Sequence, residues 1–311
     1  MKIVPIVFAF DNNLVLPACI CISSLLMNAN EDTFYDIFIL HSDKERLDKI
    51  QLNKIPQYFP NCKIQYRVVD DTFDSAFEIR GITTPAYYRL LIPELIPEYD
   101  KIIYSDVDVI FRSDLSDFYI NTKMEDDYIA GVNSLSYLIS ENLAYYKRLG
   151  VNSKGIIYSG NLLFNSKKIK EDGIISKFRS LANNKYKFQD MDILNIACEG
   201  RIKYLSPEFC LTTYILNWAI YNRHYLNEIW TDETIDKALS KGIVHYNGQK
   251  PWKGVCVNFD IWWEYYRKSP FFDEKFYFDF FYSHLSELDQ LSLWKRIKIL
   301  VRYFVFGRKK L

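Results

Sequence analysis

The N-terminal third of the chain alternates short apolar runs with segments of helical spacing, and this alternation limits the possible folds more than any other feature. The apolar runs have strand length and lie at residues 3–10, 36–40, 63–69 and 101–105. Residues 17–27 and 87–95 have helical spacing. Ser42, with Glu45 three residues later, predicts a capping box that opens a helix through Lys54. Alternating strands and helices predict an α/β fold, in which a mostly parallel sheet carries helices on both faces.

The second half of the chain is less regular. Residues 128–132 and 160–165 are predicted strands, 191–199 a helix, and 242–244 a short strand. From Asn258 onward the sequence is aromatic and helical in character. We therefore expect one catalytic domain over residues 1–257 and a helical C-terminal extension over residues 258–311.

Charge and apolar patterning exclude several classes of protein. The 39 basic and 39 acidic side chains leave a net charge of zero, so no overall field favours nucleic acid, and no nucleic-acid partner is expected. The first apolar run lacks a signal-peptide cleavage site, and no window has the roughly 18 apolar residues of a spanning helix. The six cysteines form no C-x-x-C pair, which favours buried free thiols in a reducing, cytoplasmic compartment.

Polar clusters follow two of the predicted strands at their carboxyl ends. Asp11, Asn12 and Asn13 follow the first strand, and Asp106 and Asp108 flank one valine after the fourth. Ligands of parallel α/β sheets bind at the carboxyl ends of the strands. The two clusters therefore predict one shared site.

The acidic pair has the spacing of a metal site. In an extended segment Asp106 and Asp108 point to the same face, where their repulsion is relieved by a hard divalent cation. Later in the chain, His245 can complete such a site, Lys250 can neutralise a phosphate, and Gly248 allows close backbone approach. Spacing alone leaves two other interpretations open: the aspartates cap a strand end, and His245 is a buried core histidine.

Five segments resemble those of glycosyltransferase family 8, in the family's order, across residues 3–253. They are VFAFDNN, TTPAYYRLLIPELIPEYDKIIYSDVDVIF, SGNLLFN, QDMDILN and HYNGQKPW. The family consists of retaining enzymes that include bacterial lipopolysaccharide galactosyl- and glucosyltransferases and glycogenin. The resemblance implies a Rossmann-like GT-A fold, a UDP-sugar donor of galactose or glucose, and a Mn²⁺ (or Mg²⁺) cofactor.

The resemblance also implies roles for individual residues. Asp106, Asp108 and His245 would hold the metal, and Arg89 and Asp190 would act at the donor sugar. The positions implied to bind the nucleotide-sugar are Ala9, Phe10, Asp11, Asn13, Arg89, Asp106, Val107, Ser159, Asp190, Met191, Gly248 and Lys250.

Three positions depart from the family's pattern. Leu14 stands where an aromatic residue often stacks on uracil, and Tyr158 where an asparagine is common. Met191 replaces a glutamine that has been discussed as a nucleophile. A thioether offers no anionic oxygen to the sugar, so we expect retention by front-face attack.

The last eighteen residues, 294–311, form a basic amphipathic segment without an acidic residue. Its basic residues are Lys295, Arg296, Lys298, Arg302, Arg308, Lys309 and Lys310. Such a segment suits an anionic membrane surface, here the inner face of the membrane, and with the resemblance it implies a glycolipid or surface-polysaccharide acceptor. The alternative is a terminal helix packed on the core with a solvated basic end.

Two other functions remain as alternatives. One is a sugar-nucleotide-binding protein that has lost turnover, which Met191 supports. The other is a phosphohydrolase of the haloacid-dehalogenase type, which also uses D-x-D. That class usually carries the motif near the chain start, with Thr or Val where this chain has Ile110.

Overall fold

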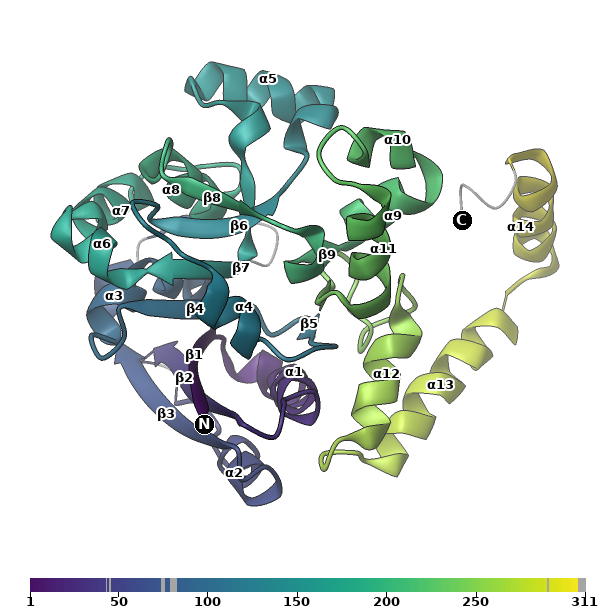
Figure 1. Cartoon of the computed structure of the whole chain (residues 1–311). Helices are drawn as coiled ribbons and strands as arrows, with labels where there is room; N and C mark the ends of the chain where they lie inside the picture. The colour runs from purple at the N-terminus through teal and green to yellow at the C-terminus, as the bar shows by residue number, and fades with distance from the viewer. Residues whose placement is uncertain (43, 45, 74–75, 79–82, 290, 307–311) are drawn as a thin grey trace.

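The computed structural model describes residues 1–42, 44, 46–73, 76–78, 83–289 and 291–306. Its centre is a seven-stranded sheet in the order β3-β2-β1-β4-β7-β6-β8 (Figure 1). The strands are β1 (Lys2–Ala9), β2 (Thr33–Ser42), β3 (Cys62–Val69), β4 (Lys101–Ser105), β6 (Ile129–Asn133), β7 (Ile157–Asn165) and β8 (Ile202–Leu205). All run parallel except β7, which is antiparallel to both of its neighbours. The predicted mostly parallel sheet is confirmed.

The strand order reverses between β1 and β4, and this reversal places the site. The chain runs outward from β1 through β2 to β3 and then returns to pair β4 with the other side of β1, where Ile6 is opposite Ile103. Such a switch point leaves a crevice at the carboxyl ends of the two strands. Asp11 follows β1 and Asp106 follows β4, so both acidic clusters lie at this crevice.

Helices cover both faces of the sheet because the central strands are apolar on both sides. In β1, Ile6 and Phe8 belong to the core cluster that contains α1 (Val15–Met27). Val7, which points to the opposite face, joins the cluster of the other helical layer. That layer comprises η4 (Thr84–Leu91), α3 (Ile92–Leu95), α6 (Ser166–Glu171), α7 (Ile174–Ala182) and α8 (Gln189–Ala197). Figure 1 shows α1 on one side of the sheet and α3, α6, α7 and α8 on the other.

A second, three-stranded sheet brings a distant segment to the site. It consists of β5 (Val109–Ile110), β10 (Val244–His245) and β9 (Leu211–Thr212), with β10 in the centre. In its register His245 is opposite Val109 on one side and Thr212 on the other. This pairing carries His245 to the residue that follows Asp108.

The helix predicted from Ser42 through Lys54 is wrong. Glu45 lies outside the described residues, residues 46–49 are irregular, and helical structure begins only at η2 (Leu52–Lys54) and α2 (Ile55–Tyr58). Asn12 explains the difference, since its side chain donates to Arg46 O at 2.8 Å and accepts from Asp48 N at 2.7 Å. These tertiary bonds use backbone groups that a helix would have paired internally.

The segment predicted as a helix over residues 87–95 is helical but begins earlier, at Thr84, and is a 3₁₀-helix as far as Leu91. The other helical elements before residue 258 are η1 (Asn12–Leu14), η3 (Asp71–Phe73), α4 (Ser116–Asn121), η5 (Ser136–Leu138), α5 (Ser140–Leu149), η6 (Ser153–Gly155), η7 (Pro207–Phe209), α9 (Thr213–Tyr221), α10 (Arg223–Leu226) and α11 (Asp232–Lys241).

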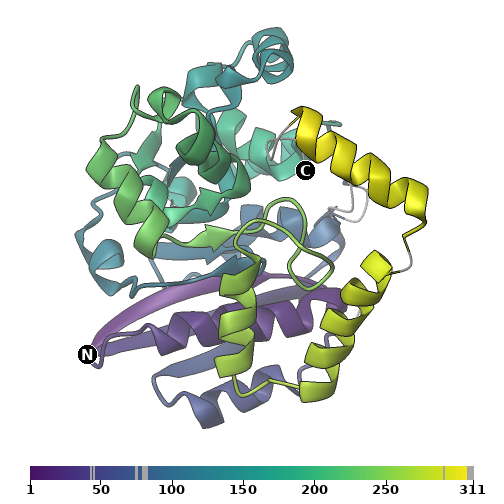
Figure 2. The same cartoon turned by 90° about the vertical axis from the view of Figure 1, so that its right-hand side faces the viewer.

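Three helices, α12 (Phe259–Lys268), α13 (Glu274–Asp289) and α14 (Leu293–Phe306), form the predicted C-terminal helical region. Trp262 and Trp263 of α12 are buried in a core cluster with Ile20 of α1. Figures 1 and 2 show α12 and α13 beside the main body, with α14 at the end of the chain. Among the described helices, none has both the length and the apolar character needed to cross a bilayer.

Candidate metal and nucleotide-sugar site

Two aspartates and one histidine converge at the carboxyl end of β4. Ligand atoms of Asp106, Asp108 and His245 all lie within 4.8 Å of one another. His245 Nε2 is 3.3 Å from Asp108 Oδ1 and 3.6 Å from Asp106 Oδ2. Two carboxylate oxygens and an imidazole nitrogen suit Mn²⁺ or Mg²⁺, so this donor set fits a divalent metal.

Gly160 of β7 leaves the room that His245 occupies. A Cβ at this position would lie 2.2 Å from His245 Cε1 and 2.9 Å from Asp106 Oδ2. The backbone at Gly160 is held in place, because its carbonyl accepts a hydrogen bond from Asp106 N at 2.7 Å and β7 is paired with β4. We did not predict this role from the sequence, where Gly160 is one residue of an apolar strand.

Cys210 holds the other nitrogen of the His245 ring. Its Sγ lies 3.4 Å from Nδ1, and both side chains are buried. Metal-binding histidines are commonly oriented by a partner at the nitrogen that does not face the metal. Cys210 was also missed, since a lone cysteine in an apolar stretch carries no signal of a partner 35 residues away.

Positive charges surround Asp108. Lys250 Nζ donates to Asp108 Oδ2 and, at 2.6 Å, to the Tyr246 carbonyl. Burial alone would raise the pKa of Asp108, but His245 and Lys250 outweigh it and hold that pKa well below its usual range. Burial would lower the pKa of His245, yet Asp108 and Cys210 raise it to about 10. Asp108 therefore lies between two cationic groups.

Arg89 of η4 joins the acidic pair to Asp190 of α8. The buried guanidinium donates from Nη2 to Asp106 Oδ1 at 2.8 Å and lies 3.3 Å, through Nη1, from Asp190 Oδ2. The same Nη1 donates to the Ser159 carbonyl at 2.6 Å. Burial raises the pKa of Asp190, and Arg89 opposes this shift. Tyr104, which we did not predict, donates a second bond to Asp106 Oδ1 at 2.6 Å.

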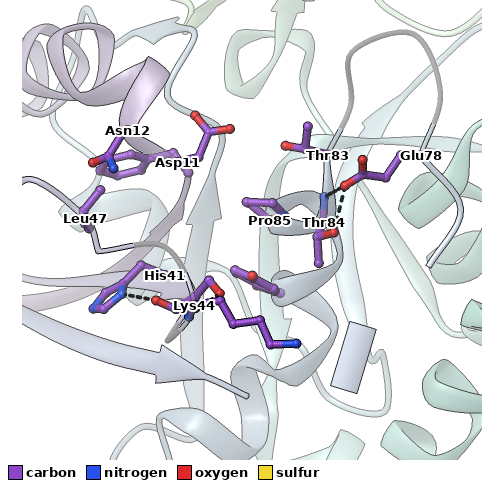
Figure 3. A pocket seen from close by; sticks show the side chains of 12 residues that line it. Asp11, Asn12, His41, Lys44, Leu47, Glu78, Thr83, Thr84 and Pro85 are labelled. Atoms are coloured by element: carbon purple, nitrogen blue, oxygen red, sulfur yellow. Dashed lines mark hydrogen bonds between the residues drawn. The ribbon is translucent and has the colours of Figure 1, made fainter. Parts of the chain in front are cut away.

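A cavity of about 250 Å³ opens beside the carboxyl ends of β1 and β2. Its lining residues are Phe10, Asp11, Asn12, His41, Ser42, Lys44, Leu47, Glu78, Thr83, Thr84, Pro85 and Tyr88. Figure 3 shows Asp11 and Asn12 on one side and Glu78, Thr83, Thr84 and Pro85 on the other. Tyr88 lines the cavity while the next residue, Arg89, bonds Asp106, so η4 connects the cavity to the acidic pair.

Other predicted binding residues lie around these two features. Ala9 ends β1, and Asn13 N donates to Asp11 Oδ1 at 2.9 Å, which fixes the turn after that strand. Val107 is buried between the two aspartates. A Cβ at Gly248 would meet nothing within 4 Å, so its backbone borders open space.

Met191 packs in a small apolar cluster beside Asp190. The cluster contains Tyr146 and Ile156, with Tyr158 and Phe188 packed against it. Leu14 packs partly buried against the main core and is absent from the cavity lining. The three positions that depart from the family's pattern thus all contribute apolar packing.

Comparison with known proteins identifies relatives along most of the chain. The family model described as glycosyl transferase family 8 matches residues 5–256. A putative glycosyltransferase of Haemophilus influenzae is 28% identical over 212 residues, which are 67% of this chain and 63% of that protein. General stress protein A of Bacillus subtilis is 24% identical over 265 residues, covering 82% and 85% of the two chains.

Solved structures share the fold. The galactosyltransferase LgtC, in complex with donor and acceptor sugar analogs, has a TM-score of 0.69 at 23% identity and covers 87% of this chain and 98% of its own. The bifunctional glycosyltransferase WbbM has a TM-score of 0.69 at 21% identity and covers 89% of this chain, but only 51% of its own. The GT-A fold implied by the resemblance is thereby confirmed. This chain spans less than two thirds of the Haemophilus protein and about half of WbbM.

Proposed function

This chain belongs to glycosyltransferase family 8, and we propose that it transfers galactose or glucose from a UDP-sugar to a saccharide acceptor with retention of configuration. The main support for the proposal is that three features lie together: three residues that could hold a metal, Lys250 bonded to one of them, and a cavity at the carboxyl end of the neighbouring strand β1. Family membership leaves the phosphohydrolase alternative without support.

We assign the metal to Asp106, Asp108 and His245, with Mn²⁺ or Mg²⁺ as the ion. When bound, the ion supplies a Lewis acid to the departing diphosphate. Lys250, whose ammonium group donates to Asp108, would supply positive charge where negative charge develops on the leaving group. Gly248 borders open space, so its backbone can approach a diphosphate closely.

The nucleoside is assigned to the cavity at the end of β1. Phe10 and Asp11 line it, and Ala9 and Asn13 directly flank lining residues in the sequence. Val107 is buried between the two aspartates of the metal site. Asp11 offers a carboxylate that can accept bonds from ribose hydroxyls or the base. A uracil ring would be recognised without an aromatic partner at position 14, since Leu14 packs against the core.

The donor sugar is assigned to the part of the site that carries Asp190, Met191 and the Ser159 backbone. As its bond to phosphate breaks, the anomeric carbon gains positive charge, which the Asp190 carboxylate stabilises. Arg89 fixes Asp190 and Asp106 relative to each other. Met191 offers no oxygen nucleophile to the anomeric carbon, which favours a route in which the acceptor oxygen attacks from the leaving-group side and gives its proton to the departing phosphate oxygen. A β-linked product from an α-linked UDP-sugar would refute this route.

The test is metal-dependent turnover of a panel of UDP-sugars by the full chain, compared with Asp108→Ala. We expect slow hydrolysis of one donor in Mn²⁺ without acceptor, and its loss in the variant. Tight metal-dependent UDP binding without hydrolysis would point either to an enzyme that awaits its acceptor or to a binding protein that Met191 has silenced. Absence of UDP binding would overturn the proposal.

We also propose that residues 1–257 form the catalytic unit and that the tail of the 258–311 extension binds an anionic membrane surface, where a glycolipid acceptor resides. Every described side chain from Ser292 to Val305 is exposed, and residues 292–306 include no acid. Leu293, Trp294 and Phe304 are at least 73% exposed, and Lys295 and Lys298 lie among them. This exposure favours surface attachment over packing on the core; Arg308, Lys309 and Lys310 lie outside the described residues.

A further inference from the structure

The loop of residues 247–257, between β10 and α12, carries both residues assigned to the diphosphate. Within the loop, Lys253 N and Gly254 N both donate to the Lys250 carbonyl, at 2.9 and 3.1 Å, and form a turn. The Lys250 side chain leaves this turn toward Asp108. The position of the ammonium group therefore depends on where the turn is held.

The turn is held by the first helix of the C-terminal region. Trp263 Nε1 of α12 donates to the Pro251 carbonyl at 3.1 Å, in a buried setting. Next to it, Trp252 of the loop packs on Trp262 with 5.5 Å between ring centroids. Figure 2 shows the loop in light green next to the upper end of α12.

The indole of Trp263 is fixed by its own surroundings. The side chain is 2% exposed and packs against Trp262, Tyr266 and Phe280, with ring centroids 4.9, 5.3 and 4.6 Å away. An indole has one donor and no acceptor. The single N–H of the buried indole therefore holds the carbonyl of Pro251, the residue directly after Lys250, in one position.

We propose that Trp263 is a positioning residue of the donor site, which sets the 247–257 loop so that Lys250 reaches the diphosphate. The C-terminal region thus positions a loop of the catalytic unit, in addition to any role of its tail. The proposal rests on the proposed function, because it takes the diphosphate as the ligand of the loop.

The test compares Trp263→Phe with Tyr266→Phe in the full chain. Each variant removes one polar group from the same aromatic cluster, but the Tyr266 hydroxyl bonds the backbone of Asp273, in the connection between α12 and α13. Losing the buried bond to Pro251 should raise the Kd for UDP in Mn²⁺ by roughly 5- to 10-fold in Trp263→Phe. Binding of Mn²⁺ alone should not weaken, and Tyr266→Phe should leave both affinities unchanged.

Amide hydrogen exchange provides a readout that does not need the nucleotide. Trp263→Phe should speed exchange in the 247–257 loop, where the amides of Lys253 and Gly254 close the turn, and Tyr266→Phe should not. If Trp263→Phe does not fold, Trp252→Ala is the second variant, because it removes a half-buried side chain that packs the same loop against α12. Unchanged exchange, or a parallel loss of Mn²⁺ and UDP affinity, would overturn the positioning role. If the unaltered chain bound no UDP, the proposed function would fail, and exchange alone would decide the role of Trp263 in holding the loop.

Discussion

Cys210 Sγ lies 3.4 Å from His245 Nδ1, on the side of the ring opposite the two aspartates. The Nε2 atom faces Asp108 Oδ1 at 3.3 Å. For Nε2 to offer a lone pair to a metal, Nδ1 must carry the proton, and the sulfur atom accepts it as a hydrogen bond. The thiol thereby favours the one tautomer that can bind the ion.

Replacing Cys210 with alanine should weaken Mn²⁺ binding about 10-fold or more, because the imidazole loses the partner that orients it. Isothermal titration calorimetry with the metal alone measures this effect. Cys198→Ala is the matched control, since Cys198 is an equally buried free thiol in the core on the other face of the sheet. Equal affinities in the two variants would show that the sulfur atom has no role at the site.

Alanine at position 160 should abolish tight metal binding while leaving the sheet intact. The added methyl group would lie 2.2 Å from His245 Cε1 on a backbone held by strand pairing, so the ring must move away from the aspartates. We expect Mn²⁺ affinity to fall at least about 10-fold, with an unchanged far-ultraviolet circular dichroism spectrum. Gly248→Ala, where the methyl group meets open space, should bind Mn²⁺ normally. Normal metal binding by Gly160→Ala would contradict the placement of His245.

Metal binding should strengthen as pH rises. The pKa of His245 is raised to about 10 in the metal-free protein, so the ring is protonated at neutral pH and must lose this proton to bind an ion. Below pH 10, affinity should therefore rise by up to about tenfold per pH unit, with about one proton released per Mn²⁺. Calorimetry between pH 6 and pH 8, in buffers of different ionisation enthalpy, counts the released protons. Binding without proton release would mean that His245 is neutral beforehand.

Removing the charge of Lys250 should have opposite effects on the metal and the nucleotide. In Lys250→Met, Asp108 loses a competing cation, so Mn²⁺ alone should bind about 3- to 10-fold more tightly. UDP should bind more weakly in the presence of Mn²⁺, because the cation assigned to the diphosphate is gone. Lys253→Met, an exposed lysine in the same loop, is the control and should change neither affinity. Weaker binding of both ligands in Lys250→Met would show that Lys250 supports the site without competing for it.

A chain that ends at Leu291 should lose binding to anionic vesicles and keep its activity on a water-soluble acceptor. The deleted segment presents exposed apolar side chains beside Lys295, Lys298 and Arg302, and carries no acid. Sedimentation with vesicles containing phosphatidylserine, compared with neutral vesicles and with high salt, measures the attachment. Equal binding by the truncated and full chains would rule out the tail as the anchor.

The sequence alone was enough to predict the parallel α/β sheet, the position of the acidic pair at a strand end and the helical C-terminal region. Each of these depends on local information. A continuous apolar run signals a strand buried on both faces, and residues two apart in an extended segment point the same way. The five family segments added candidates such as Arg89, which the structure places between Asp106 and Asp190.

Only the tertiary structure decided how distant segments complete the site. Pairing of β10 with β5 brings His245 to the aspartates, Cys210 fixes its ring, Gly160 leaves space for it, and Trp263 holds the loop of Lys250. Long-range hydrogen bonds also explain why no helix begins at Ser42. The Asn12 side chain bonds the carbonyl of residue 46 and the amide of residue 48, which a helix would have paired internally. Local sequence patterns do not identify such partners, because a contact between two distant segments forms only when the folded sheet brings those segments together.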